Sequence, residues 1–138
     1  MRLKHAGAAA LALAACGCVP QVDSKAGDQV AATFYRQVAA KDYAAIYQGS
    51  APELKNSVTL ELFTGMMQRI DRKLGACGAP QKQMSWRVNM TNAGVFRDQG
   101  YQRTCANGRL DETVTTVTRG GRTVLAGYHA NSPVLMTD

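Results

Sequence analysis

The feature that most constrains the fold is a change in the spacing of apolar residues at Pro80. Before Pro80, apolar residues recur every three or four positions, which places them on one face of an α-helix. After Pro80 they alternate with polar residues, the spacing of a β-strand with one buried face. A chain with helices first and strands afterwards is expected to be an α+β protein, its helices packed on one face of a sheet.

The first half contains two short predicted helices after a longer one. An amphipathic helix is predicted over Asp28 to Lys41, and Asp42 is expected to cap a short helix that ends at Gly49. The run Ser50-Ala51-Pro52-Glu53 has the pattern of a capping box with proline in the first turn, so a further short helix should follow it.

A longer helix is predicted between Thr59, as its N-cap, and Gly75, as its stop. Arg72 and Lys73 fall in its last turn, where cations interact favourably with the helix dipole. Its apolar stripe is expected to be buried and consists of Leu62, Phe63, Met66, Met67, Ile70 and Leu74.

The second half is predicted to form four antiparallel strands. The first should bury Met84, Trp86, Val88 and Met90 on one face. Asn107-Gly108 and Gly120-Gly121 are typical hairpin turns, so the chain should form an antiparallel meander. The other predicted strands are Tyr101 to Ala106, Leu110 to Thr118, and Thr123 to Ala130, the last with Val124, Ala126, Tyr128 and Ala130 on its core face and His129 exposed.

The N-terminus has the pattern of a secretory signal. Arg2, Lys4 and His5 precede an apolar run over residues 6–15, which is too short to span a bilayer as a helix. The following Leu13-Ala14-Ala15-Cys16 resembles the bacterial lipobox, which implies cleavage before Cys16 and its acylation. The expected organisation is a signal over residues 1–15, a lipidated tether over 16–27 and one α+β domain over 28–138.

The lipid anchor implies a location in the bacterial cell envelope. Gly17 follows Cys16 where an aspartate would resemble an inner-membrane retention signal, so we expect the inner leaflet of the outer membrane, facing the periplasm. Loss of residues 1–15 lowers the net charge from +6 to 14 − 10 = +4. The remaining cations are scattered singly, which argues against nucleic acid as a partner.

The cysteines fit an oxidising compartment. Cys77 and Cys105 lie within the domain and are expected to form a disulfide, which by loop entropy would contribute about 3–4 kcal/mol. Two free thiols or a metal pair are the competing interpretations, although neither a third cysteine nor a histidine lies nearby. Cys18 lies in the tether with its role open: a second modification, an intermolecular bridge or an idle thiol.

Short motifs spread over residues 28–131 suggest a family. They are Phe34-Tyr35, Asp42-Tyr43-Ala44-Ala45-Ile46-Tyr47, Arg72-Lys73-Leu74-Gly75, Glu112-Thr113-Val114-Thr115 and Gly127-Tyr128. In these the chain resembles small bacterial lipoproteins with a cystatin-like or nuclear-transport-factor-2-like domain, many of unknown function. The resemblance implies a cone, in which a curved sheet wraps a long helix and leaves a pocket at its open end. Such cones serve enzymes, ligand binders and structural modules, so the fold does not fix the function.

The sequence contains no recognisable catalytic constellation. It lacks a nucleophile-elbow motif and a phosphate-binding glycine loop. Asp111 and Glu112 are adjacent on a strand and so should face opposite sides. Isomerases of the cone superfamily use an Asp base with Tyr or Asp donors, for which Asp42, Tyr101 and Tyr128 are the available residues. We predict no catalytic residues, no metal and no cofactor.

Two sets of residues are candidates for binding. Met66, Met67, Trp86, Met90, Tyr101 and Tyr128 could line a soft apolar pocket in the cone, or they could be plain core. Arg103, Arg109, Arg119 and Arg122 could form a surface for an acidic protein partner, or they could be solvated cations that discourage sheet aggregation.

The predicted function is that of a lipid-anchored periplasmic binding module for a protein partner or a small apolar ligand. The alternatives are an immunity lipoprotein that neutralises a toxin acting in the periplasm, and an enzyme with an Asp/Tyr site in the cone. The sequence leaves the partner and the oligomeric state open.

Overall fold

A computed structural model of the chain describes residues 24–138 and confirms the α+β arrangement. The four strands form one antiparallel sheet in the order β1-β2-β3-β4, the predicted meander. The elements in chain order are α1 (Ser24–Ala39), α2 (Tyr43–Gln48), α3 (Pro52–Ser57), α4 (Leu60–Leu74), β1 (Gln81–Thr91), β2 (Gly94–Cys105), β3 (Gly108–Arg119), β4 (Arg122–Asn131) and α5 (Pro133–Met136).

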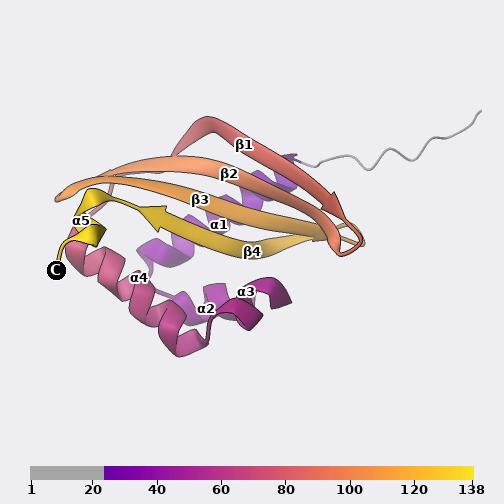
Figure 1. Cartoon of the computed structure of the whole chain (residues 1–138), viewed down its shortest axis with the longest axis horizontal. Helices are drawn as coiled ribbons and strands as arrows, with labels where there is room; N and C mark the ends of the chain where they lie inside the picture. The colour runs from indigo at the N-terminus through magenta and orange to yellow at the C-terminus, as the bar shows by residue number, and fades with distance from the viewer. Residues whose placement is uncertain (1–23) are drawn as a thin grey trace, which may run out of the picture.

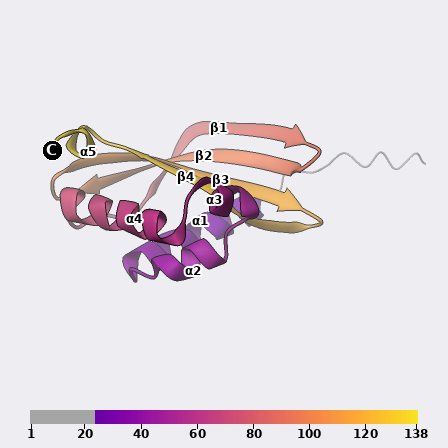
Figure 2. The ribbon, with the colours of Figure 1, turned by 60° about the horizontal axis from the view of Figure 1, so that its bottom comes forward.

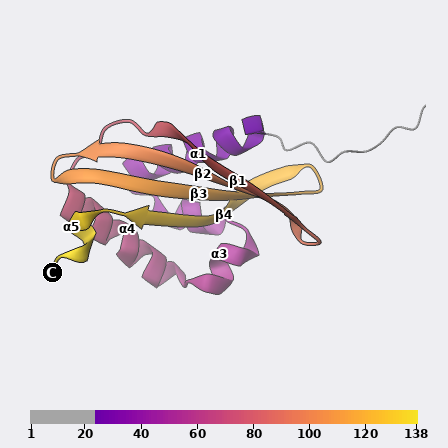
Figure 3. The same ribbon diagram turned by 45° about the horizontal axis from the view of Figure 1, so that its top comes forward.

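The helices form a layer on one face of the curved sheet (Figures 1 and 2). They pack mainly on β3 and β4, whereas β1 contacts mainly its neighbour β2. The sheet is twisted, so that the tips of the β1-β2 and β3-β4 hairpins diverge at one end (Figure 3). Because β1 is first in the strand order, it is an edge strand, and it lies away from most of the helix layer.

The first helix begins earlier than the sequence predicts. α1 starts at Ser24, not Asp28, so residues 24–27 belong to the domain and not to the tether. Gly27 is buried against the sheet, where an added Cβ would lie 2.9 Å from a guanidinium nitrogen of Arg97. The start of α1 thus packs closely on β2 because residue 27 has no side chain.

Two of the three predicted helix caps are confirmed. The Asp42 carboxylate accepts a hydrogen bond from Ala45 N at 3.2 Å, and the Thr59 hydroxyl accepts one from Leu62 N at 3.3 Å. The predicted capping box of α3 is wrong: Ala51 is the N-cap, and Ser50 instead donates its hydroxyl to Ile46 O at 2.6 Å. Ser50 therefore stabilises the end of α2.

The main core lies between α1, α4 and the sheet. It includes Phe34 of α1, Phe63 and Leu74 of α4, and Leu110 and Val114 of β3, each at most 1% exposed. The predicted stripe of α4 is wider than its buried face, because Leu62 is 65% and Met66 38% exposed while Phe63, Met67, Ile70 and Leu74 are buried.

The strands are longer than predicted, and β4 differs in register. β2 begins at Gly94 and not at Tyr101. Its more polar first half is paired with β1, and the ion pair between Arg87 of β1 and Asp98 of β2 is one of the contacts that hold it there. In β4 the pairing with β3 shifts between Thr115 and Thr116, which leaves Ala126 as an extra residue. The predicted single core face of β4 is therefore wrong: Leu125 and Tyr128 pack on the main core, whereas Ala126 joins a second small cluster with Ala51 and Val117.

Candidate functional site

The first candidate site is an exposed apolar face on the edge strand. Met84, Trp86, Val88 and Met90 of β1 form this surface, which we call the β1 apolar face. Met84 is 96%, Trp86 66% and Met90 57% exposed, so the predicted burial of this strand face is wrong. Its apolar residues point toward the helix side of the sheet, as Lys82 and Arg97 do, but the helix layer does not cover them.

A bulge in β1 positions this face. The register with β2 shifts between Lys82 and Trp86, so that residues 83–85 lie opposite Gly100. The buried Gln99 side chain donates to Gln83 O at 2.7 Å and to Ser85 O at 3.3 Å, which ties the bulge to β2. The bulge also brings Ser85 close to Gly100. A Cβ at position 100 would lie 2.1 Å from the Ser85 hydroxyl oxygen, so a larger residue there would collide with Ser85.

The β1 apolar face borders a groove of about 710 Å³ that reaches the start of α1. At its polar end, Asp28 of α1 forms ion pairs with Lys82 at 2.8 Å and with Arg97 at 3.3 Å. Burial works to raise the pKa of Asp28, but the hydrogen bonds from Lys82 and Arg97 outweigh it and hold the pKa below its ordinary value of 3.8. The groove is lined by Ser24, Lys82, Gln83, Met84, Trp86, Val88, Met90, Arg97 and Gln99.

The six residues predicted to line one pocket are not brought together. Only Trp86 and Met90 line the groove. Met67 and Tyr101 are buried in the main core, Tyr128 packs against it partly buried, and Met66 is exposed on α4. A common cone pocket with these six residues is therefore wrong: three of them belong to the core or pack against it, and the other three are exposed.

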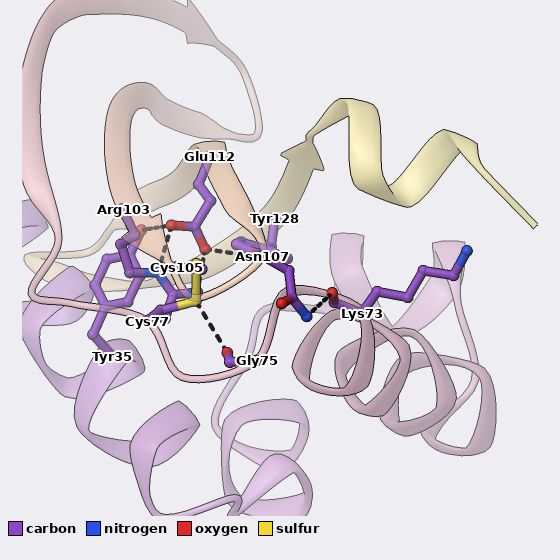
Figure 4. Close-up of a disulfide and its surroundings, with 9 residues drawn as sticks. All are labelled: Tyr35, Lys73, Gly75, Cys77, Arg103, Cys105, Asn107, Glu112 and Tyr128. Atoms are coloured by element: carbon purple, nitrogen blue, oxygen red, sulfur yellow. Dashed lines mark hydrogen bonds and ion pairs between the residues drawn. A yellow bond between two sulfur atoms is a disulfide. The ribbon is translucent and has the colours of Figure 1, made fainter.

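The second notable feature is a buried polar cluster around Glu112, drawn in Figure 4. The Glu112 side chain is fully buried and receives two hydrogen bonds from Arg103, at 2.8 Å from Nε and at 2.7 Å from Nη2. Its carboxylate also accepts the hydroxyls of Tyr128, at 2.6 Å, and of Tyr35, at 3.3 Å. The Arg103 guanidinium lies over the Tyr35 ring, 5.1 Å from its centre.

The two tyrosines act as fixed donors in this cluster. Burial first, and then the negative charge of Glu112, raise the pKa of Tyr35 and of Tyr128 well above the ordinary value of 10.0. Both hydroxyls therefore keep their protons, and each carboxylate oxygen of Glu112 accepts two hydrogen bonds. The cluster joins α1 to β2, β3 and β4, which is a structural role.

Sequence reasoning missed this cluster. It placed Asp111 and Glu112 on opposite faces, as the structure has them, but it did not identify the partners of Glu112. The available signal was a charged residue at an inward position between Leu110 and Val114, since a buried carboxylate requires a cation or donors.

The predicted pairing of Cys77 and Cys105 is present beside this cluster (Figure 4). Around it the segment after α4 is hydrogen-bonded to the end of β2, from Gly78 N to Thr104 O and from Ala106 N to Ala76 O, both at 2.8 Å. Asn107 of the predicted hairpin turn also donates its side-chain amide to Lys73 O at 2.9 Å. The disulfide thus lies where the helical half joins the sheet.

The four arginines predicted as one partner surface have different environments. Arg103 is buried against Glu112, so its assignment to a surface is wrong. Arg109 is exposed and pairs with Asp111 at 2.9 Å. Arg119 pairs with Glu53 of α3 and donates to Ala93 O, and Arg122 is exposed at the β3-β4 turn.

The residues considered for catalysis are also separated by role. Asp42 caps α2 at the surface, Tyr101 packs edge-on to Tyr35 in the core, and Tyr128 is bound to Glu112. His129 is exposed. Within residues 24–138, His, Cys, Asp and Glu form no group of three or more that could hold a metal ion, and no helix is long and apolar enough to cross a bilayer.

The predicted signal, Cys16, Gly17 and Cys18 lie outside the described residues. Neither a protein-family model nor a curated protein matches this sequence.

Proposed function

We propose that this protein is a lipid-anchored, periplasmic binding module that does not catalyse a reaction. In this proposal Cys16 carries the lipid, and the domain belongs with the small lipoproteins that have a cystatin-like or nuclear-transport-factor-2-like fold. The β1 apolar face is its binding surface, and it takes up an apolar partner or ligand.

The observation that carries the proposal is the exposure of the β1 apolar face. Exposed apolar side chains are common singly, but a contiguous set on one strand face typically belongs to an interaction site. Here Met84, Trp86 and Met90 are each more than half exposed and lie beside one groove. Methionine side chains adapt to varied shapes, and tryptophan contributes a large apolar area.

The contrast with the Glu112 cluster supports binding over catalysis. A catalytic carboxylate needs to reach a substrate, whereas the carboxylate of Glu112 is fully buried and accepts hydrogen bonds from Arg103, Tyr35 and Tyr128.

An apolar fluorescent dye tests the binding surface. In the unlipidated mature chain, residues 16–138 with Cys16→Ser, we expect anilinonaphthalene sulfonate to bind beside Trp86 and to take up its excitation energy. Trp86 is the only tryptophan of the chain, so this energy transfer reports on one place. The double variant Met84→Ser/Met90→Ser should bind the dye several-fold more weakly with an unchanged circular dichroism spectrum.

Leu62→Ser is the matched control, because Leu62 is as exposed as Trp86 but lies on α4. It should leave dye binding unchanged. Equal dye binding by wild type and by the Met84→Ser/Met90→Ser variant would show that the β1 apolar face is not a binding surface.

A further inference from the structure

We propose that the β1 apolar face docks on the membrane, with Met84, Trp86 and Met90 inserted among the headgroups and upper acyl chains of the bilayer that anchors the chain. This inference rests on the proposed lipid at Cys16 and names the apolar partner of the proposed binding surface.

The composition of the face suits a membrane surface. Its side chains are apolar, and tryptophan is enriched at the level of lipid headgroups because its ring is apolar with one polar N–H. The face lies on an edge strand that the helices leave uncovered, so its side chains can enter a bilayer surface without a change in the core.

The start of the described chain lies beside the same face. Ser24 lines the groove with Trp86 and Met90, and its carbonyl accepts a hydrogen bond from Arg97 at 3.2 Å. Eight peptide units separate Cys16 from Ser24, which can span at most about 29 Å when fully extended. A lipid on Cys16 would therefore hold this end of the domain at the bilayer, whereas the C-terminus lies at the other end of the molecule (Figure 1).

The charges at the rim of the face favour a phosphate-bearing surface. Lys82 and Arg97 share the carboxylate of Asp28, so the trio carries one net positive charge, and Lys82, with its side chain 46% exposed, is its accessible cation because Arg97 is 11% exposed. Lys25 follows Ser24 directly and is exposed, while Asp23 precedes Ser24 in the sequence and offsets its charge, so the net positive charge comes from Lys82. Cations beside inserted apolar side chains strengthen binding to anionic lipid.

The strand itself argues against a second copy or a partner strand as the occupant. Pairing along the whole β1 edge requires a regular register, and the bulge at residues 83–85 interrupts it near the start of the strand, which leaves only residues 86–91 in regular register. A membrane needs no register, because it contacts side chains and not the backbone edge.

The test uses the lipidated protein in vesicles of zwitterionic and anionic phospholipid, with and without bromine on the acyl chains. Bromine quenches tryptophan only at short range, so Trp86 should lose most of its emission in brominated vesicles. It should also be shielded from acrylamide there, compared with the unlipidated chain in solution. In the lipidated Met84→Ser/Met90→Ser variant, both effects should largely disappear.

The matched control moves the tryptophan to α4 in the lipidated variant Trp86→Phe/Leu62→Trp. Its emission should be insensitive to brominated lipid, because Leu62 is exposed on another element. If acyl labelling shows that the wild type is anchored but Trp86 is not quenched by brominated lipid, membrane docking is overturned while the anchor stands. Shielding from acrylamide without bromine quenching would mean that protein covers the face, which also overturns it. Absence of acyl label would overturn the proposed anchor instead.

Discussion

At the scale of single residues, Glu112 links α1 to three strands of the sheet. Its buried carboxylate gathers Arg103, Tyr35 and Tyr128, which come from β2, α1 and β4. A buried ion pair adds little stability relative to an apolar pair, but loss of one partner leaves an uncompensated charge in the interior. The neighbouring Asp111 faces the other side and pairs with the exposed Arg109.

This difference predicts unequal effects of two similar substitutions. Glu112→Gln should lower the free energy of unfolding by about 3–5 kcal/mol, because Arg103 then stays buried without a counter-charge. Asp111→Asn, the matched control on the same strand, should lower it by less than about 1 kcal/mol, because exposed ion pairs are screened by water. Urea denaturation of both variants measures the two changes, and equal effects would contradict the role given to the cluster.

At the scale of elements, α1 is linked to the β1-β2 edge through Asp28. Gly27 lets the helix approach β2, and Lys82 and Arg97 then bind the carboxylate of the next residue. A lowered pKa in the folded state means that folding is stabilised above the unfolded pKa of the group. This stabilisation is lost as the pH falls through the folded pKa.

Asp28→Asn should therefore have a pH-dependent effect. At neutral pH it should lower the free energy of unfolding by about 1–3 kcal/mol, between the values for an exposed and a buried pair, since the Asp28 side chain is 42% exposed but Arg97, at 11%, loses its carboxylate partner. As the pH falls below the ordinary aspartate value of 3.8, the difference from wild type should shrink toward zero. Gln29→Asn, at an exposed neighbouring position, controls for the helix propensity of asparagine. A difference that stays constant or grows in acid would show that the ion pairs do not link α1 to the sheet.

At the scale of the whole molecule, the two ends of the domain have different surroundings. α5 packs beside α4 at the C-terminal end, where Arg69 donates to Leu135 O at 3.1 Å. At the other end the described chain begins next to the β1 apolar face. An anchor at Cys16 and a docking face at β1 would then act on the same end of the molecule.

The anchor is tested by removal of its thiol. Cys16→Ser should abolish acyl labelling and move the protein from the membrane fraction to the soluble fraction, because the acyl chains supply the apolar area for stable attachment. Cys18→Ser should keep both the lipid and the membrane fraction, which shows that the position matters and not the number of cysteines. A Cys16→Ser protein that still carries lipid would refute the anchor.

The sequence by itself determined the order and type of the elements, because helix and strand periods, caps and turn residues act over a few neighbours. Asp42 and Thr59 cap their helices, Gly120 and Gly121 turn with positive φ of 55° and 75°, and Cys77 meets Cys105. Only the tertiary structure decided which faces are covered. The alternation of Trp86 and its neighbours predicts one apolar face, but its exposure depends on where the helix layer ends. The bulge in β4 and the partners of Glu112 likewise depend on strands and helices far apart in the chain, which no local pattern specifies.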